Sequence, residues 1–392
     1  MSRKIVTDPV TGMKKCRVFK RCGGCQLQEP YKDQLERKQQ KAQRMLSKFA
    51  HVNEILPMDD PWGYRCKVQN IFGLDSSKRI ISGIYQSSGQ KLTAVEDCML
   101  EDPRCAPVIR TLKKLMKDMR IAPYDLRTGR GLLRHTLMRT SFTTGQMMLV
   151  LVTAGPVLPA KKNLVKALLR SHPEITTIVQ NICPDGMPLT LGERSEVLYG
   201  EGYIEDELCG CRFRISPASF YQVNPIQTEK LYNCAVKAAG IGKGVTVIDA
   251  YCGTGTIGMI CAKNGAEVTG VELNKSACRD AVMNAKLNSL ENIRFYNDDA
   301  GRFMVELAKK GESCDVLIMD PPRAGASREF IESALKMAPA KIVYVSCKIE
   351  TLERDLKNFR RGGYRVTYIQ PVDMFPHTTG IETVCLLEKG EK

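Results

Sequence analysis

The second half of the chain alternates between short apolar runs and stretches with helical periodicity. Its first apolar run, 245–249, is continuous, as in a strand that is buried on both faces of a parallel sheet. Similar runs recur at 267–271, 293–296, 316–319 and 342–345, and further strands are expected at 365–369 and 383–387. With a helix expected over 218–239, this alternation predicts a doubly wound α/β domain over residues 217–392.

The region before residue 217 has a different pattern. Between 68 and 95, short alternations of apolar and polar residues are broken by Ser and Asp clusters, which is typical of antiparallel hairpins. Helices are expected over 104–120 and 160–170, and a pair of strands over 132–140 and 146–153. We therefore expect a mixed, β-rich domain over residues 53–216.

Positive charge is concentrated near the N-terminus. The net charge is +15, and residues 1–48 hold thirteen Lys and Arg against four Asp and Glu, including an expected basic helix over 31–50. A basic surface attracts the phosphates of nucleic acids, although a solvated helix face would have the same composition. We expect a nucleic-acid partner and treat residues 1–52 as a separate N-terminal segment.

The chain has the composition of a cytoplasmic protein. It contains no run of eighteen apolar residues, and its start leads into Asp8 and Pro9 rather than into an apolar stretch. We therefore expect a monomer in the cytoplasm with no membrane partner. Because cytosolic thiols stay reduced, the 16 cysteines favour packing, catalysis or metal binding over disulfides.

A glycine-rich turn follows the first buried strand. The segment 249–258 contains closely spaced glycines, and Glu272 comes about twenty residues after the turn, where a carboxylate can accept both hydroxyls of a ribose. These features look like the class I methyltransferase fold, whose ligand is S-adenosylmethionine. The segment Asp320-Pro321-Pro322-Arg323, after the fourth strand, argues against a nicotinamide enzyme. A helix cap before two prolines is the alternative for Asp320.

A cysteine at the end of the fifth strand suggests a covalent mechanism. Carbon 5 of uracil is too poor a nucleophile to accept a methyl group until a thiolate adds to C6 and makes the ring an enolate. Cys347 lies at a strand end beside the edge that carries Asp320, which suits this chemistry. Taken alone, it would more readily be interpreted as one more buried thiol.

Several motifs together resemble the RNA (uracil-5-)-methyltransferase family. They are Ser346-Cys347-Lys348 with Thr351, Leu352 and Asp355, the Asp320–Arg323 segment, 375–384, and Phe220-Tyr221-Gln222-Val223-Asn224. The resemblance covers nearly the whole chain. It implies that Cys347 is the nucleophile and that Glu382 is the base that removes the C5 proton. It also implies that S-adenosylmethionine is held by Gln222, Tyr251, Glu272 and Asp320.

The same resemblance favours a uridine in structured RNA as the substrate. RNA cytosine-5 methyltransferases carry a second cysteine after the Asp-Pro segment, where this chain has Arg323 and Ala324. Many relatives begin with a small RNA-binding barrel, for which the fifteen residues before Cys16 leave no room. Shorter ribosomal RNA methyltransferases of the family share this layout, and members that act on transfer RNA often lack the cysteine array described below. The resemblance therefore implies 23S ribosomal RNA first and transfer RNA second. His377 is expected to make structural hydrogen bonds rather than to transfer protons.

Four cysteines form a candidate metal site: Cys16, Cys22, Cys25 and Cys98. Spacing alone does not distinguish zinc from an iron–sulfur cluster, whereas the resemblance implies [4Fe-4S]. Cys66 and Cys105 are alternatives for the fourth ligand. A different class of function also fits these residues, namely an RNA-binding iron–sulfur protein without catalytic activity.

Overall fold

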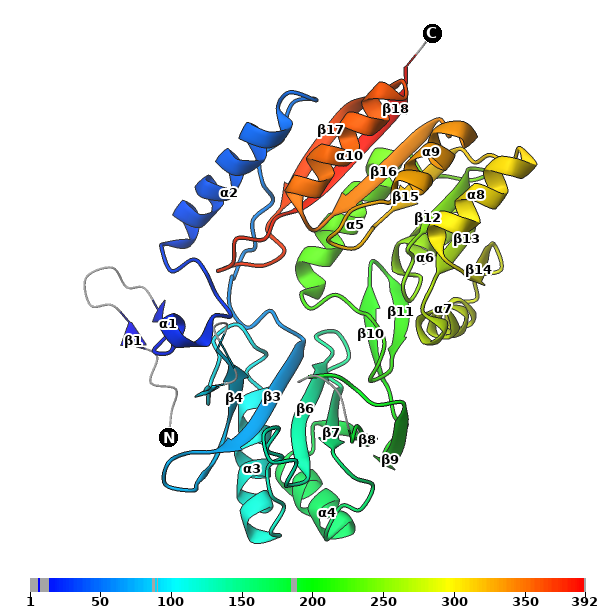
Figure 1. Ribbon diagram of the computed structural model, residues 1–392. Helices are drawn as coiled ribbons and strands as arrows, with labels where there is room; N and C mark the ends of the chain where they lie inside the picture. Colours follow the sequence, from blue (N-terminus) through cyan, green and yellow to red (C-terminus); the bar gives the residue numbers. More distant parts are fainter. Residues whose placement is uncertain (1–5, 8–13, 87–88, 90, 185–188, 391–392) are drawn as a thin grey trace. The chain divides into compact units, whose positions relative to one another are not determined.

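The computed structural model describes residues 6–7, 14–86, 89, 91–184 and 189–390, and the chain divides into two compact units. Unit 1 comprises Met1–Gln28, Pro61–Asp206 and Ile215–Ala218, and unit 2 comprises Glu29–Asp60, Glu207–Arg214 and Ser219–Lys392. Figure 1 shows their elements. The two units do not follow the three expected segments one for one, because residues 29–60 belong to unit 2.

Unit 2 is built on a seven-stranded sheet of order β14-β13-β12-β15-β16-β18-β17. The strands are β12 (Thr246–Ala250), β13 (Glu267–Glu272), β14 (Ile293–Asn297), β15 (Val316–Met319), β16 (Lys341–Ser346), β17 (Tyr364–Val372) and β18 (Glu382–Lys389). Neighbours from β14 to β16 are parallel, and β18 is antiparallel to both β16 and β17. The expected doubly wound α/β fold is confirmed.

Helices cover both faces of this sheet. They are α5 (Pro225–Ala239), α6 (Thr256–Lys263), α7 (Lys275–Leu287), α8 (Ala300–Lys310), α9 (Arg328–Met337) and α10 (Ile349–Arg361). The chain moves outward from β12 to β14 and then returns to β15, and right-handed crossovers therefore place α6 and α7 on one face and α8, α9 and α10 on the other. Buried residues of α8, α9 and α10 form one core cluster with the strands.

Helix α5 begins later than the sequence suggested. A helix was expected from residue 218, but α5 begins at Pro225, and the Asn224 side chain caps it by accepting a hydrogen bond from the Gln227 N–H. Proline is favoured in the first turn of a helix, and it disfavours helical geometry in the residue before it. The segment 219–224 is therefore a loop that leads into the helix.

Helix α2 (Tyr31–Leu46) belongs to unit 2 and packs beside β17 and α10 (Figure 1). Its buried residues lie four apart, at Gln34, Lys38, Ala42 and Leu46, so they form one stripe along the helix. The segment after α2 extends the sheet, since Asn53 donates a hydrogen bond to the Ile369 carbonyl. The basic helix is thus partly a buried element.

Unit 1 contains a second seven-stranded sheet, of order β5-β4-β3-β6-β7-β8-β9. Its strands are β3 (Lys67–Leu74), β4 (Ile80–Tyr85), β5 (Leu92–Ala94), β6 (Leu133–Thr140), β7 (Met147–Thr153), β8 (Ile175–Ile182) and β9 (Arg194–Tyr199). Helices α3 (Cys105–Asp118) and α4 (Lys161–Ser171) share a hydrophobic core with it. The sequence did not predict β8, β9 or the hairpin of β10 (Ile204–Leu208) and β11 (Cys211–Ile215).

Short elements complete the described part of the chain. β1 (Val6–Thr7) pairs with β2 (Lys14–Lys15), and α1 (Phe19–Cys22) follows. Among the described residues, no helix combines the length and the apolar character that crossing a membrane requires.

Candidate active site

Strand pairing brings Cys347 and Glu382 together. Strands β16 and β18 are antiparallel, and Ser346 at the end of β16 is the partner of Thr383 near the start of β18. One step further in this register places Cys347 opposite Glu382. The fold therefore joins the two residues that the resemblance assigned to the reaction.

Asp320 and Tyr251 lie at the same edge of the sheet, each directly after a strand. Ala250 at the end of β12 pairs with Met319 at the end of β15, and the next residue of each strand is Tyr251 and Asp320. After β12 the chain continues to β13 on one side of the sheet, and after β15 it continues to β16 on the other side. The carboxyl ends of β12 and β15 therefore flank the crevice where open α/β sheets bind ligands.

Cys347 is half-buried in an acidic environment. The pKa of the Cys347 thiol is raised from 9.0 to about 11, mainly by burial and also by the negative charges of Glu382 and Asp320. The Arg323 guanidinium acts in the opposite direction. Arg323 is therefore a neighbour that favours the thiolate, which is the nucleophilic form of the residue.

Glu382 is buried and shares these neighbours. The pKa of its carboxyl group is raised from 4.5 to about 8, mainly by burial and also by the charge of Asp320, while Arg323 opposes the shift. Burial likewise raises the pKa of Asp320 to about 7. A carboxyl group with a pKa near neutrality can exchange a proton at working pH, which suits a general base.

These pKa shifts predict how the rate depends on pH. Raised pKa values leave Cys347 as a thiol and Glu382 protonated at low pH, so, with the roles that the resemblance implies, the single-turnover rate of product formation should rise from pH 6 to pH 9. Arg323→Gln should move this rise to higher pH. Arg328→Gln, which removes an exposed cation from α9, should not move it. A rate that stays constant over this range would contradict the assigned environment.

The glycine-rich turn permits close packing at the start of α6. Gly255 has φ of +81°, and a Cβ there would lie 2.7 Å from the Phe295 ring. At Gly258 a Cβ would lie 2.9 Å from an Asp249 carboxylate oxygen, which accepts the Gly258 N–H at 2.8 Å. The turn and the first strand are therefore fixed together, with the helix N-terminus at the carboxyl edge of the sheet.

Glu272, at the end of β13, is hydrogen-bonded to the glycine-rich turn. One of its carboxylate oxygens accepts the Gly253 N–H at 2.9 Å, and the other accepts the Asn274 N–H at 2.7 Å. Each carboxylate oxygen has a second lone pair that can accept a ribose hydroxyl. Tyr251 has a positive φ of +65°, and its ring lies 5.3 Å from the Phe330 ring, centroid to centroid.

Gln222 is connected to the site through Tyr232, a residue that the sequence analysis missed. Tyr232 on α5 is buried, and its hydroxyl is hydrogen-bonded to Gln222 and Thr256. Asp320 also interacts with Tyr232 electrostatically. Nothing local in the helical sequence distinguishes this tyrosine from a core residue.

Asp299 is a second residue that the sequence analysis missed. It follows β14 at the same edge of the sheet, caps α8 by accepting the Arg302 N–H, and interacts electrostatically with Tyr251. A carboxylate after the third parallel strand can accept a hydrogen bond from an adenine amino group. The signal in the sequence was Asn297-Asp298-Asp299 directly after an apolar strand.

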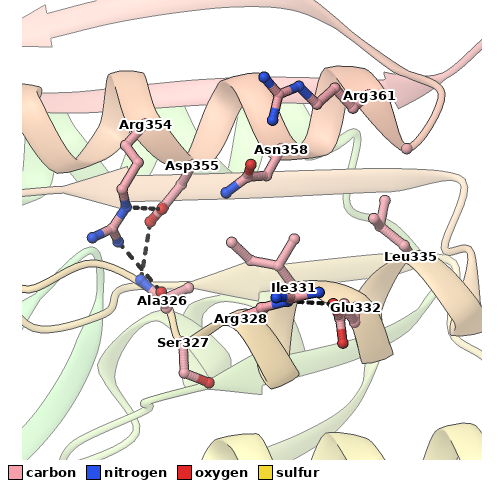
Figure 2. Close-up of a pocket in the computed structure, with 11 residues that line it drawn as sticks. Ala326, Ser327, Arg328, Ile331, Glu332, Leu335, Arg354, Asp355, Asn358 and Arg361 are labelled. Carbon is pink, nitrogen blue, oxygen red and sulfur yellow. Dashed lines mark hydrogen bonds and ion pairs between the residues drawn. The ribbon is translucent and has the colours of Figure 1, made fainter.

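The segment after Asp320–Arg323 is fastened to α10. Arg354 donates to the Ala324 carbonyl at 2.9 Å, and Asp355 accepts the Ala326 N–H at 3.0 Å and the Tyr344 hydroxyl at 2.7 Å. Arg354 also donates to Asp355 (Figure 2). The segment that directly follows Arg323 is thus held in place by Arg354 and Asp355 of α10.

A cavity of about 790 Å³ lies between α9 and α10. Figure 2 shows Ile331 on α9 facing Asn358 on α10, with Arg354 and Arg361 along the same helix. None of the residues at the carboxyl edge of the sheet lines this cavity. It is therefore separate from the site of Cys347.

The four cysteines of the candidate metal site lie in unit 1, and their thiols interact electrostatically. Cys16 and Cys22 raise the pKa of the Cys25 thiol, in addition to its burial, and Cys25 raises that of Cys98. Buried Cys66 and Cys105 interact with each other instead. Within the part of the chain that the structure describes, no three His, Cys, Asp or Glu side chains are arranged so that they could hold a metal ion.

Known proteins resemble this chain over most of its length. The family model for tRNA (Uracil-5-)-methyltransferase matches residues 192–390. An uncharacterized RNA methyltransferase of Halalkalibacterium halodurans is 40% identical over 379 residues, which cover 95% of this chain and 82% of the relative. Another, of Listeria monocytogenes, is 41% identical over 377 residues, which cover 95% and 83%.

A solved structure has the same fold. The tRNA (uracil-54, C5)-methyltransferase of Pyrococcus abyssi in complex with S-adenosyl-L-homocysteine matches with a TM-score of 0.78 and 27% identity, covering 92% of this chain and 84% of that chain. The fold and the site therefore define a class I S-adenosylmethionine-dependent methyltransferase. The chain belongs to the tRNA (uracil-5-)-methyltransferase family, a family of RNA-modifying enzymes, which confirms the resemblance seen in its motifs.

Proposed function

We propose that this protein transfers a methyl group from S-adenosylmethionine to C5 of a uridine in structured RNA, with 23S ribosomal RNA as the first candidate. The observation that carries the proposal is the register of β16 and β18, which places Cys347 opposite Glu382 beside Asp320 and Arg323. A thiol, a buried carboxyl group and a cation at the cofactor edge are what C5 methylation requires.

Cys347 and Glu382 act one after the other in the proposed reaction. The Cys347 thiolate adds to C6 of the uracil, and the electron pair of the C5=C6 bond moves into the ring as an enolate. C5 then attacks the methyl group of the sulfonium. Glu382 removes the C5 proton, the double bond re-forms, and the C6–S bond breaks to release the thiolate.

The cofactor is assigned to the carboxyl edge of the sheet. Glu272 would accept the ribose hydroxyls, and Tyr251 and Gln222 would contact the rest of the molecule, with Asp320 near the reacting group. The support is that Glu272 is hydrogen-bonded to the turn between β12 and α6, that Tyr251 and Asp320 follow neighbouring strand ends, and that Gln222 is connected to the start of α6 through Tyr232. The Pyrococcus relative was solved with the demethylated form of this cofactor.

The class of RNA is the part of the proposal that sequence similarity supports least. The cysteine array favours ribosomal RNA, whereas the family description and the Pyrococcus relative name transfer RNA. Transfer RNA is therefore the second candidate substrate. A catalytically inactive RNA-binding protein is disfavoured because the reactive groups are present and lie together.

The test is to incubate the protein with methyl-labelled S-adenosylmethionine and unmodified 23S ribosomal RNA or transfer RNA transcripts, and to map the labelled nucleoside. We expect 5-methyluridine at a defined position in one transcript. Label in cytidine, or no label in either RNA, would overturn the proposal.

We also propose that Cys16, Cys22, Cys25 and Cys98 bind a [4Fe-4S] cluster, with zinc as the alternative. The support is that these thiols interact in one unit and that the partly buried Arg65 interacts with three of them, offsetting the charge of thiolates. The cluster would join the N-terminal segment to the sheet of unit 1. The cluster would take no part in the proposed methyl-transfer reaction.

The cluster proposal predicts iron in the purified protein. Protein purified without oxygen should be brown and contain about four irons per chain. Cys98→Ala should lose most of this iron. Cys105→Ala, which changes a buried thiol that interacts with Cys66 instead, should retain it. Colourless protein with one zinc would refute the cluster without affecting the methylation proposal.

A further inference from the structure

A buried ion pair fastens α2 to the loop that connects β17 to β18. The Lys38 ammonium donates to Asp373 at 2.5 Å and to the Phe375 carbonyl at 3.1 Å. The side chains of Lys38 and Asp373 are 2% and 0% exposed. Burial lowers the pKa of Lys38 and the charge of Asp373 opposes this shift. Because a lone buried charge is costly, each of the two residues fixes the position of the other.

Two further residues of α2 bind the same loop. The Tyr31 hydroxyl donates to the second oxygen of Asp373 at 2.7 Å. Gln34, which is fully buried, accepts the His377 N–H at 2.9 Å and lies 3.2 Å from the His377 ring nitrogen Nδ1. His377 thus makes the structural hydrogen bonds that the sequence analysis expected. Tyr31, Gln34 and Lys38 occur three and four residues apart, so they share one face of the helix.

The start of α5 holds the loop as well. Asn224 donates to the Met374 carbonyl at 2.9 Å, and Gln227 donates to the Asp373 carbonyl at 3.0 Å. Asn224 ends the segment that contains Gln222, a residue assigned to the cofactor. The loop is therefore bound by side chains of two elements that are distant from it in sequence.

The loop leads directly into Glu382. Its first residue, Asp373, follows Val372, and Val372 is the strand partner of Glu382. Resting on the proposed function, we propose that Lys38 and Asp373 are positioning residues for proton removal, and that α2 holds Glu382 where it meets the C5 proton. The N-terminal helix is then a part of the catalytic apparatus and more than a basic surface for RNA.

This inference concerns one step of the reaction. Thiolate addition and methyl transfer form bonds at C6 and C5 without Glu382, whereas breaking the C5–H bond needs the carboxylate at the correct place. A displaced Glu382 should therefore slow release of the proton and of the thiolate. The methylated adduct on Cys347 should then accumulate, which a general loss of stability would not produce.

The experiment uses the full chain with the double substitution Lys38→Met and Asp373→Asn, which removes both charges and leaves neither unpaired. The probe is a 23S ribosomal or transfer RNA transcript labelled with tritium at uridine C5. We expect tritium release to slow at least about tenfold, part of the effect of a general base. The KM for S-adenosylmethionine should stay within about twofold, and a methylated protein–RNA adduct should appear on denaturing gels.

Lys41→Met is the matched control. Lys41 lies on the same helix but pairs with Glu350 of α10, away from the loop. It should leave tritium release unchanged and give no adduct. Tyr31→Phe, which removes only the hydroxyl bonded to Asp373, tests the same point with a milder change and should slow release to a smaller extent.

Equal losses of adduct and product in the double variant, or unchanged tritium release in it and in Tyr31→Phe, would overturn the inference. The proposed function has a separate control. If the wild type forms no adduct with 5-fluorouridine RNA, the covalent mechanism itself fails, whatever the variants do.

Discussion

Cys347→Ala is expected to abolish methylation and to form no covalent complex with RNA. Without addition of the thiolate at C6, C5 of uracil does not become nucleophilic, and the remaining residues offer no other route to the enolate. The rate should fall by more than about a thousandfold, the scale seen when a covalent nucleophile is removed. Methyl transfer to an RNA transcript and denaturing electrophoresis of the complex measure both effects.

Cys385→Ala is a suitable control for this substitution. Cys385 lies fully buried in β18, in the same sheet, and has no role in the proposed chemistry. A decrease of activity in this variant should follow its stability rather than show a block of adduct formation. Covalent trapping of fluorinated RNA by Cys347→Ala would show that another residue is the nucleophile.

Glu382→Gln is expected to stop the reaction at a later point. Addition and methyl transfer remain possible, but the amide cannot accept the C5 proton, so turnover should fall by about 10²–10⁴-fold. The methylated adduct should accumulate and survive denaturation. This outcome is the opposite of the one for Cys347→Ala, although the two residues lie at paired strand ends.

RNA that contains 5-fluorouridine should trap the wild type in the same state as Glu382→Gln, because fluorine at C5 cannot leave as a proton does. The target base must also leave its stack to reach Cys347. Rapid turnover by Glu382→Gln would transfer the role of base to another group. Asp320 would be the first candidate, since it is the neighbouring carboxyl group that raises the pKa of Glu382.

The C-terminal domain and most of its candidate site could be predicted from local patterns in the sequence. Strands such as β12 and β15 are buried on both faces, so each is a continuous apolar run, and the glycines and Glu272 follow them at short range. The motifs around Cys347 and Asp320 are likewise local. A reader of the sequence can find them because the chemistry and the chain turn coincide within a few residues.

Which distant residues come into contact could not be predicted in this way, because it depends on the order of the strands and on long-range packing. The insertion of β18 between β16 and β17 places Glu382 beside Cys347, and no local pattern encodes that strand order. Lys38 lies in a basic run that suggested solvent and RNA, yet it is buried against Asp373. Charge and periodicity describe a helix face, but its partner comes from a loop far along the chain. The raised pKa values of Cys347 and Glu382 have the same origin, because burial and neighbouring charges exist only in the folded protein.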